Sequence, residues 1–290
     1  MRPLAAVLLL GACATGTRAD EAFDAAKPPD SSSGDAEPSP IDARGMDTMP
    51  GAAAAALLIT EVVLAPSTGE FVEIANPTAQ TVDLSTYYLA DAGVYFQLPA
   101  GAPTVDQNDF IVKFPVGASI APGAVITVAL DTATNFQTVY ATSPSFSIAS
   151  GTMTSVKQNA VATLTNAGEV IVLFHWDGQG DLVHDVDIVL AGAPSVANGL
   201  VDKSGQALDG PDADTATTAY STDARTLAAQ AVAPNSGFST KRIALEAGHE
   251  TQSGSGNGIA GDDETSEDTA ATWDTTFTAP TPGTLPAGLL

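Results

Sequence analysis

The sequence predicts an all-β protein, built as a sandwich or a barrel of short antiparallel strands. Between residues 57 and 190, short apolar or alternating runs are separated by Gly, Pro, Asn and Asp residues. This is the pattern of strands joined by tight turns, and few helical stretches interrupt it. A chain of 290 residues with 44% hydrophobic residues is also long enough to bury a substantial core.

Eight strands are expected in this region. In the second of them, strict alternation places Val72 and Ile74 on the face opposite Phe71. The last two strands are joined by the stretch "WDGQGD", residues 176–181, whose Asp-Gly pair is a strong hairpin signal. The expected strands are 57–64, 69–76, 81–90, 93–98, 109–114, 124–130, 169–176 and 182–190.

Beyond the last strand the composition changes. Residues 191–236 are rich in Asp, Ala, Thr and Ser, contain the turn cluster "DGPDAD" at 209–214, and offer one short helical stretch near 223–231. We expect a long loop-rich insertion here, which either leaves the sandwich as an excursion or forms a small lobe. The chain returns to β-like residues at 271–283 before it ends.

The amino terminus has the features of an export signal. Arg2 precedes an apolar stretch at 4–10, and the small residues Gly11 and Ala12 precede Cys13, the only cysteine of the chain. The stretch is too short for a lasting transmembrane helix. Exported proteins usually keep their cysteines in pairs, so a single cysteine at the cleavage boundary needs another explanation than a disulfide.

The stretch "LGAC" that ends in Cys13 resembles the lipobox of bacterial lipoproteins. The resemblance implies removal of residues 1–12, attachment of acyl chains to Cys13, and a permanent membrane anchor in a bacterial cell envelope. Ala14 follows the cysteine where Asp favours the inner membrane of Gram-negative bacteria, which points to the outer membrane. The alternative is an ordinary secretory signal with an unmodified cysteine.

Residues 13–51 are expected to be a disordered tether. They are rich in Pro, Ser, Asp, Glu and Ala and have almost no large apolar residues, so they cannot offset the entropy cost of ordering. A flexible chain of this length has ends about 30–40 Å apart. The tether would therefore hold the folded part away from the membrane.

The charge of the chain excludes one class of partner. Asp and Glu number 34 against 10 Lys and Arg, which gives a formal net charge of −24. Affinity for nucleic acids depends on Lys and Arg that displace counterions from phosphates. We therefore expect no nucleic-acid partner.

Five segments, in the same order along the chain, resemble parts of the lamin tail domain family. The opening "LLITEVVLAPSTGEFVEIANPTAQTVDLSTYYLAD" (57–91) carries I-x-E-V, G-E-F-V-E-I-x-N-P and V-D-L-S motifs. The others are "IAPGAVITVA" (120–129), "LTNAGEVIVLFHWDGQGDLVHDVDI" (164–188), "FSTKRI" (238–243) and "ATWDTTFTAPTPG" (271–283). The resemblance implies an immunoglobulin-like β-sandwich over 52–290. It also implies a non-catalytic adhesion, scaffold or binding module with a protein or polymer partner, and not an enzyme.

Two other functions remain open. A metal-dependent hydrolase would use His175 or His184 with Asp177, Asp185 or Asp187, but alternation predicts that Asp185 and Asp187 share the solvated face of an edge strand. His184 is expected at an edge or facing the core, His175 at a strand rim, and His249 lacks the second histidine of a zinc helix. A polysaccharide-binding module would need an exposed aromatic strip, and only 6% of residues are aromatic.

Two acidic loops could bind calcium. Ca²⁺ takes six to eight oxygen ligands, which Asp-rich loops supply, but neither loop has EF-hand spacing. The sequence favours a solvated acidic surface for both, so no cofactor is expected and structural calcium stays the open alternative. The candidate ligands are Asp209, Asp212 and Asp214 in the first loop, and Asp262, Asp263 and Glu264 in the "DDETSED" loop.

Overall fold

A computed structural model describes residues 56–192, 201–222, 233–245, 257–258 and 264–290. Several predictions fall outside these residues: the signal peptide 1–12, Cys13, the tether 13–51, the helix near 223–231, His249, and Asp262 with Asp263. Among the described residues, no helix combines the length and the apolar character that crossing a membrane requires.

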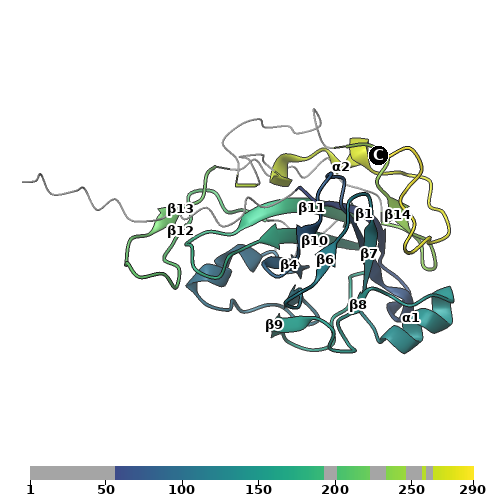
Figure 1. The fold of residues 1–290 in the computed structure, drawn as a ribbon, viewed down its shortest axis with the longest axis horizontal. Helices are drawn as coiled ribbons and strands as arrows, with labels where there is room; N and C mark the ends of the chain where they lie inside the picture. Colours follow the sequence, from purple (N-terminus) through teal and green to yellow (C-terminus); the bar gives the residue numbers. More distant parts are fainter. Residues whose placement is uncertain (1–55, 193–200, 223–232, 246–256, 259–263) are drawn as a thin grey trace, which may run out of the picture. The chain divides into compact units, whose positions relative to one another are not determined.

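Two five-stranded sheets form the body of the fold (Figure 1). Neighbouring strands pair antiparallel, apart from a parallel pair at one edge of the first sheet. The first sheet has the order β14 (Thr240–Lys241), β1 (Leu58–Val63), β2 (Phe71–Ala75), β7 (Val125–Ala129) and β8 (Phe146–Ser147). The second has the order β11 (His184–Gly192), β10 (Gly168–His175), β4 (Tyr87–Ala90), β5 (Phe110–Lys113) and β9 (Thr154–Gln158).

The main hydrophobic core lies between the two sheets and draws on both. Val72 and Ile74 of β2 belong to it together with Leu89 of β4 and Leu173 of β10. Phe71 lies on the opposite face of β2, as alternation predicted. The all-β, immunoglobulin-like sandwich expected from the sequence is confirmed.

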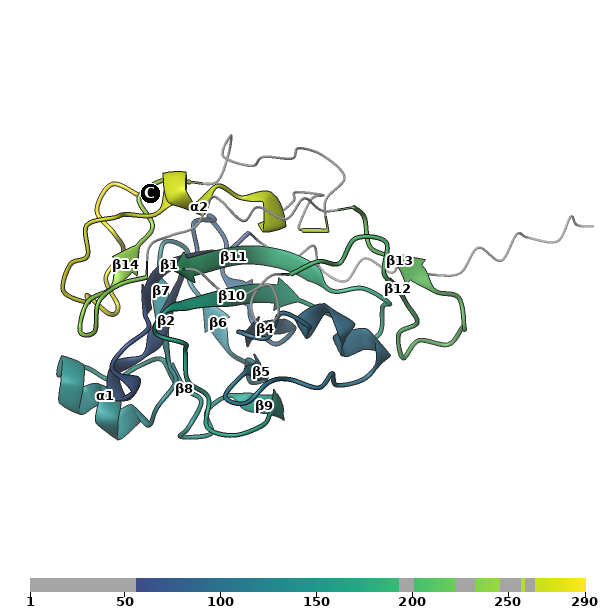
Figure 2. The ribbon, with the colours of Figure 1, turned by 180° about the vertical axis from the view of Figure 1, so that it is seen from behind.

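Both sheets are also covered on their outer faces. Helix α1 (Ala133–Tyr140) places Phe136 against Phe71 on the outside of the first sheet, and Figure 2 shows this helix beside β8. The second sheet is covered by η2 (Tyr95–Ala100) and by residues 201–222. This coverage explains why several strands are continuous apolar runs, since both faces exclude water.

Residues 201–222 pack on the second sheet within the segment expected to be an insertion. Val201 and Tyr220 belong to the outer core of that sheet. Between them, β12 (Ala207–Leu208) and β13 (Thr218–Ala219) form a short hairpin. The Tyr220 hydroxyl donates to the carbonyl of Phe96 at 2.9 Å, which ties the hairpin to η2.

The strand predicted over 93–98 is wrong, because this stretch forms the 3₁₀ helix η2. Its N–H groups bond three residues back, as from Tyr95 to Ala92 at 3.0 Å. Tyr95 and Phe96 are adjacent yet both buried, which a strand with one buried face does not allow. Pro99 lies within the helix and has no N–H to give to a sheet.

The other predicted strands are confirmed, with changes in detail. The run 81–90 divides into β3 (Val82–Asp83) and β4, because a turn at Leu84–Tyr87 interrupts it. β3 pairs with β6 (Ser119–Ile120) as a separate two-stranded sheet. β9 and α1 were not predicted from the sequence, because β9 is polar and α1 buries only Phe136 fully.

The carboxyl-terminal segment is held by two buried glutamates of the first sheet. Glu61 and Glu73 are cross-strand partners in β1 and β2. Glu61 accepts hydrogen bonds from the N–H and the hydroxyl of Thr281 at 2.9 and 3.0 Å, and Glu73 accepts from the N–H of Gly283 at 2.7 Å. The glutamates of the I-x-E-V and F-V-E-I motifs thus anchor the closing T-P-G motif.

We expect the protein to lose stability as the pH rises from about 5 to about 7.5. Burial raises the pKa of Glu70, Glu73 and Glu169 from 4.5 to about 7. The folded state therefore holds protons that the unfolded state has released between these values. The stability they contribute is complete below pH 4.5 and is lost as the pH rises through 7. Melting temperatures at pH 5.5 and 7.5 measure this loss.

Glu73→Gln serves as the control, because the amide keeps the size of the side chain and cannot titrate. We expect its melting temperature to fall less between pH 5.5 and 7.5 than that of the unmodified chain. An equal fall in both proteins would show that Glu73 does not contribute to the pH dependence.

Candidate functional site

The candidate site lies where the edge strand β11 meets the carboxyl-terminal segments. A β-bulge interrupts the pairing of β10 with β11, so that Leu173 lies opposite Asp187 but Phe174 lies opposite Asp185. Leu173 faces the main core and Phe174 faces the outer core. The bulge therefore turns the two aspartates to opposite faces of the sheet, which corrects the prediction that they share one.

Asp185 forms a buried ion pair on the outer side. Its carboxylate accepts hydrogen bonds from the ammonium group of Lys203 and from the hydroxyl of Tyr95. Lys203 is 0% exposed and lies 5.8 Å from the ring centres of both Tyr95 and Tyr220. Asp185 is thus engaged inside the protein, and the prediction that it lies on a solvated face is wrong.

Asp187 forms a second buried ion pair on the inner side. Nη2 of Arg242 donates to its two oxygens at 2.7 and 2.9 Å, and the N–H of Ile59 donates to Oδ2. The Nε of Arg242 donates to the carbonyl of Ile59 at 2.8 Å. The guanidinium group also lies 5.1 Å from the ring centre of Trp273. Arg242, which directly follows the edge strand β14, therefore joins β1 of the first sheet and β11 of the second sheet to the closing segment.

Two side chains of the acidic segment 264–268, those of Glu264 and Glu267, are buried at this junction. Glu264 begins η4 (Glu264–Ser266), and Glu267 precedes the short helix α2 (Thr269–Thr272). Nη1 of Arg242 donates to Oε1 of Glu267 at 2.9 Å, and the hydroxyl of Thr272 donates to the same atom at 2.6 Å. Both glutamates are buried. The expectation of a solvated acidic surface is therefore wrong for them.

One carboxylate oxygen from each of Asp187, Glu264 and Glu267 lies within 4.8 Å of the others. We call these three residues the buried carboxylate cluster. Burial raises the pKa of Glu264 well above its ordinary value, and the negative charges of Asp187, Glu267 and Asp185 raise it further, while Arg242 opposes the shift. Oε2 of Glu267 is buried and has no hydrogen-bond partner in the described part of the chain.

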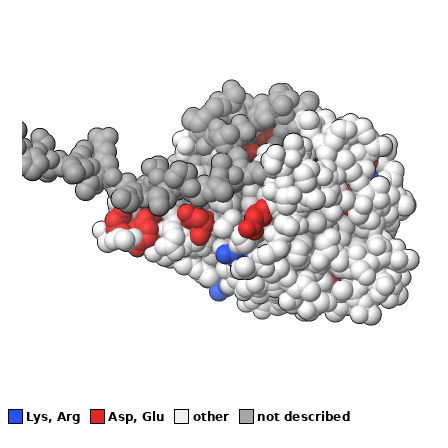
Figure 3. All heavy atoms as spheres, in the orientation of Figure 1, with Lys and Arg blue, Asp and Glu red and all other residues white. Residues whose placement is uncertain are grey.

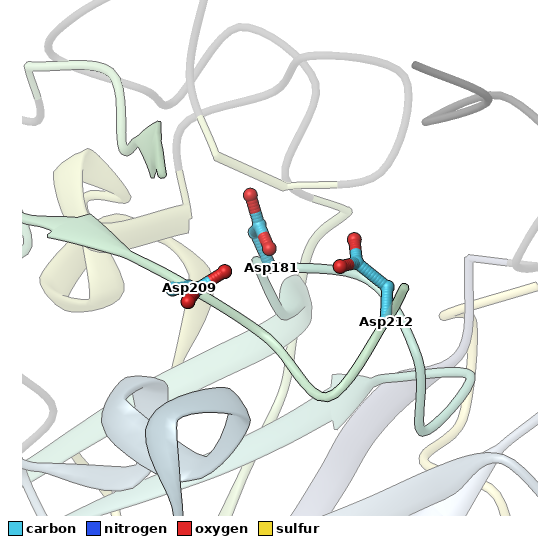
Figure 4. Close-up of side chains that lie close together, drawn as sticks. All are labelled: Asp181, Asp209 and Asp212. Carbon is cyan, nitrogen blue, oxygen red and sulfur yellow. The ribbon is translucent and has the colours of Figure 1, made fainter. Parts of the chain in front are cut away.

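A second group of carboxylates lies near the surface, at the β12–β13 hairpin. In Figure 4, Asp181 lies between Asp209 and Asp212, and one oxygen of each lies within 4.8 Å of the others. We call these three residues the hairpin carboxylate cluster. The structure thus brings together two of the three calcium candidates of the first loop. Asp214 does not join them, because its carboxylate accepts the N–H of Ala216 at 2.7 Å.

The carboxylate of Asp181 already has protein donors. The N–H of Gly210 donates to its Oδ1 at 2.7 Å, and the hydroxyl of Thr218 donates to its Oδ2 at 2.6 Å. Asp209 is exposed and Asp181 is buried. The buried aspartate of this cluster therefore has a structural role, which is to hold the hairpin against the loop before β11.

The structure brings His175 and His184 of the hydrolase alternative together near Asp177, while Asp185 and Asp187 are held in buried ion pairs. His175 and His184 are cross-strand partners, with His184 exposed at the edge strand and His175 packed 5.2 Å from the ring of Tyr87. Burial lowers the pKa of His175, and nearby His184 lowers it further while Asp177 opposes the shift. Asp177 caps its own turn by accepting N–H groups of Gln179 and Gly180.

A hollow of about 640 Å³ opens elsewhere on the domain, beside the loop before β2. It is lined by Pro66, Ser67, Glu70 and residues 163–167 among others, and none of its lining residues is aromatic. The large hydrophobic side chains that the described residues expose include a single aromatic one, Phe238. Neither feature supplies the aromatic strip that the polysaccharide-binding alternative requires.

The two cations of the site and Tyr95 were not predicted as site residues from the sequence. Arg242 belongs to the predicted "FSTKRI" motif, whereas no motif contains Lys203. A usable signal was present in "HDVDIVL", since a strand buried on both faces can accept Asp185 and Asp187 only if cations accompany them. With ten Lys and Arg residues in the chain, the candidates were few.

Part of the chain matches the model of a known family. Residues 50–189 match the family model of the Lamin Tail Domain. Among solved structures, the chain is similar to a DUF4876 family protein from Bacteroides thetaiotaomicron, at 13% identity and a TM-score of 0.41, over 81% of this chain and 75% of that chain. No curated protein matches the chain.

Proposed function

Since this chain carries a lamin tail domain at residues 50–189, we propose that it is a non-catalytic lipoprotein of a bacterial cell envelope. In this proposal Cys13 carries the lipid anchor, residues 13–51 form a tether, and the immunoglobulin-like sandwich serves as a binding, adhesion or scaffold module. The anchoring membrane is the outer membrane.

The position of the cysteine carries this proposal. Cys13 is the only cysteine of the chain, and it directly follows an apolar stretch that ends in Leu10, Gly11 and Ala12. Lipobox sequences have this form. Each buried CH₂ of an acyl chain contributes about 0.8 kcal/mol, so several acyl chains on one cysteine would hold the protein at the membrane permanently.

The roles of the buried charged groups support a non-catalytic module. Asp185 and Asp187, which a hydrolase would need, are engaged by Lys203 and Arg242 in ion pairs that join separate segments of the fold. Catalytic carboxylates need access to a substrate, and these two are 1% and 0% exposed. Their position fits a rigid scaffold better than an active site.

The surface charge indicates the kind of partner. Figure 3 shows acidic side chains gathered near the β12–β13 hairpin, with little Lys or Arg surface on the same face. The formal net charge of −24 would repel nucleic acids and acidic polymers. We therefore propose a protein or an uncharged or basic polymer as the partner of the module.

We expect Cys13→Ser to release the protein from the membrane. The full chain would be produced in a Gram-negative host, and the membrane and soluble fractions would be compared by immunoblot. The unmodified chain should pellet with membranes and Cys13→Ser should not, because serine cannot form the thioether to a lipid. Equal recovery of both proteins in the membrane fraction would overturn the anchor.

The matched control is Ala14→Asp, one residue after the cysteine. This variant keeps the acceptor thiol, so it should remain in the membrane fraction. We expect density-gradient separation to show it in the inner membrane, while the unmodified chain is recovered with the outer membrane.

A further inference from the structure

The junction around β11 buries more negative than positive charge. Asp187, Glu264 and Glu267 lie around Arg242 on the inner side of β11, and Asp185 pairs with Lys203 on the outer side. Each of the six residues is at most 8% exposed. Among the described residues, the four carboxylates of the junction therefore outnumber its two cations. Burying an excess of negative charge is costly, so a bound cation or a proton would stabilise the junction.

Hydrogen bonding within the junction is also incomplete, and this observation does not depend on the charge count. Oε1 of Glu267 accepts from both Arg242 and Thr272, at 2.9 and 2.6 Å. Oε2 of the same side chain, which is 1% exposed, has no donor among the described residues. Buried carboxylate oxygens nearly always have a partner, and an exception calls for an ion or a proton.

The geometry of the three carboxylates suits a cation. Asp187 is held in place by Arg242 and by the N–H of Ile59, and it comes from β11. Glu264 and Glu267 come from the segment that packs on β11. One oxygen from each lies within 4.8 Å of the other two, so that at most a small inward movement of the side chains would let one ion contact all three at about 2.3–2.6 Å.

We propose that Asp187, Glu264 and Glu267 bind one divalent cation of the hard, oxygen-preferring kind, with Ca²⁺ as the ion of choice. All three ligands are carboxylates, which favour Ca²⁺ or Mg²⁺ over softer metals. A divalent ion would offset the excess of negative charge among these described residues. It would attach η4 to the edge of the sandwich, and so fix the acidic segment to β11.

The hairpin carboxylate cluster provides the internal comparison. Its buried member, Asp181, already receives one protein donor on each oxygen, and Asp209 is exposed. Solvent and protein donors therefore satisfy that cluster without an ion, whereas the buried carboxylate cluster lacks a donor for Glu267.

In the first test, the full chain is purified in detergent and treated with a chelator to remove bound metal ions. Its melting temperature is then measured as CaCl₂ is added. At a Ca²⁺ concentration about 100 times the dissociation constant, the melting temperature should rise by about 5–10 °C. Glu264→Gln should lose most of this rise, and Asp212→Asn should keep it. No rise with Ca²⁺ or Mg²⁺, an equal rise in Glu264→Gln, or a loss in Asp212→Asn would each overturn the proposal.

A second test works even if Glu264→Gln does not fold. Tb³⁺ replaces Ca²⁺ at oxygen sites and emits when a nearby tryptophan is excited. Trp273 stacks on Arg242, which contacts two of the proposed ligands. We expect Tb³⁺ emission that excess Ca²⁺ abolishes and that Trp273→Phe reduces several-fold. Absence of Tb³⁺ emission would show that no ion binds near a tryptophan. Emission that is unchanged in Trp273→Phe would place the ion at another site. Either result would overturn the proposal.

Discussion

Arg242→Met is expected to lower the free energy of unfolding by about 3–5 kcal/mol. Arg242 is fully buried and donates to Asp187, Glu267 and the carbonyl of Ile59. Methionine fills much of the same space but leaves two carboxylates buried beside Glu264 without their cation. The cost therefore comes mostly from uncompensated charge and not from lost packing. Urea unfolding followed by far-ultraviolet circular dichroism measures the change.

Lys241→Met is the matched control, on the residue that precedes Arg242 and ends β14. Lys241 is 15% exposed and lies 3.5 Å from Glu61, which also accepts two hydrogen bonds from Thr281. Glu61 thus keeps partners when Lys241 is removed, and we expect a loss of only about 0–1 kcal/mol. If Arg242→Met costs no more than Lys241→Met, the buried junction is not a main source of stability.

Trp273→Ala is expected to cost about 3–5 kcal/mol, chiefly through the cavity it leaves. Trp273 is 1% exposed, belongs to the main core between the sheets and lies against the guanidinium of Arg242. Its backbone also pairs with that of Arg242. Removing the indole would detach the closing segment from both partners. The same urea unfolding measures the loss.

Trp273→Phe separates packing from hydrogen bonding. The indole Nε1 is buried and has no hydrogen-bond partner among the described residues, so phenylalanine gives up volume but no hydrogen bond. We expect a cost of about 1–2 kcal/mol, well below that of alanine. Equal costs for the two variants would mean that the ring does not fill the core as the structure has it.

The strands of the sandwich were predictable because their signal is local. Val72 and Ile74 alternate with Phe71, and this period alone assigns the two faces of β2 correctly. The motifs at 238–243 and 271–283 were recognised as parts of a family pattern. Their physical role came only from the structure, in which Arg242 and Trp273 close the junction and Thr281 and Gly283 bind the glutamates of β1 and β2.

The candidate site was harder to predict because it depends on register and on distant partners. The bulge that turns Asp185 and Asp187 apart arises from the pairing of β11 with β10, which single-strand alternation does not include. Arg242 lies 55 residues after Asp187, and Lys203 lies 18 residues after Asp185. Net charge gave no help, since an acidic chain offers many carboxylates for each cation.

The folded domain is described by the structure, whereas the anchor and the tether are proposed from the sequence. The described residues give a sandwich covered on both outer faces and closed by ionic and hydrogen-bonded contacts with its carboxyl-terminal segments. The proposed anchor and tether rest on the sequence of residues 1–51. The function proposed for the module depends on its attachment to the envelope, so attachment is the central claim.

The mass of the amino-terminal peptide tests this claim most directly. The full chain would be extracted from host membranes, digested and analysed by mass spectrometry. We expect residues 1–12 to be absent, so that Cys13 is the first residue. Cys13 should carry a diacylglyceryl group on its sulfur and an acyl group on its amine. A peptide that retains residues 1–12, or begins at another residue with Cys13 unmodified, would contradict it.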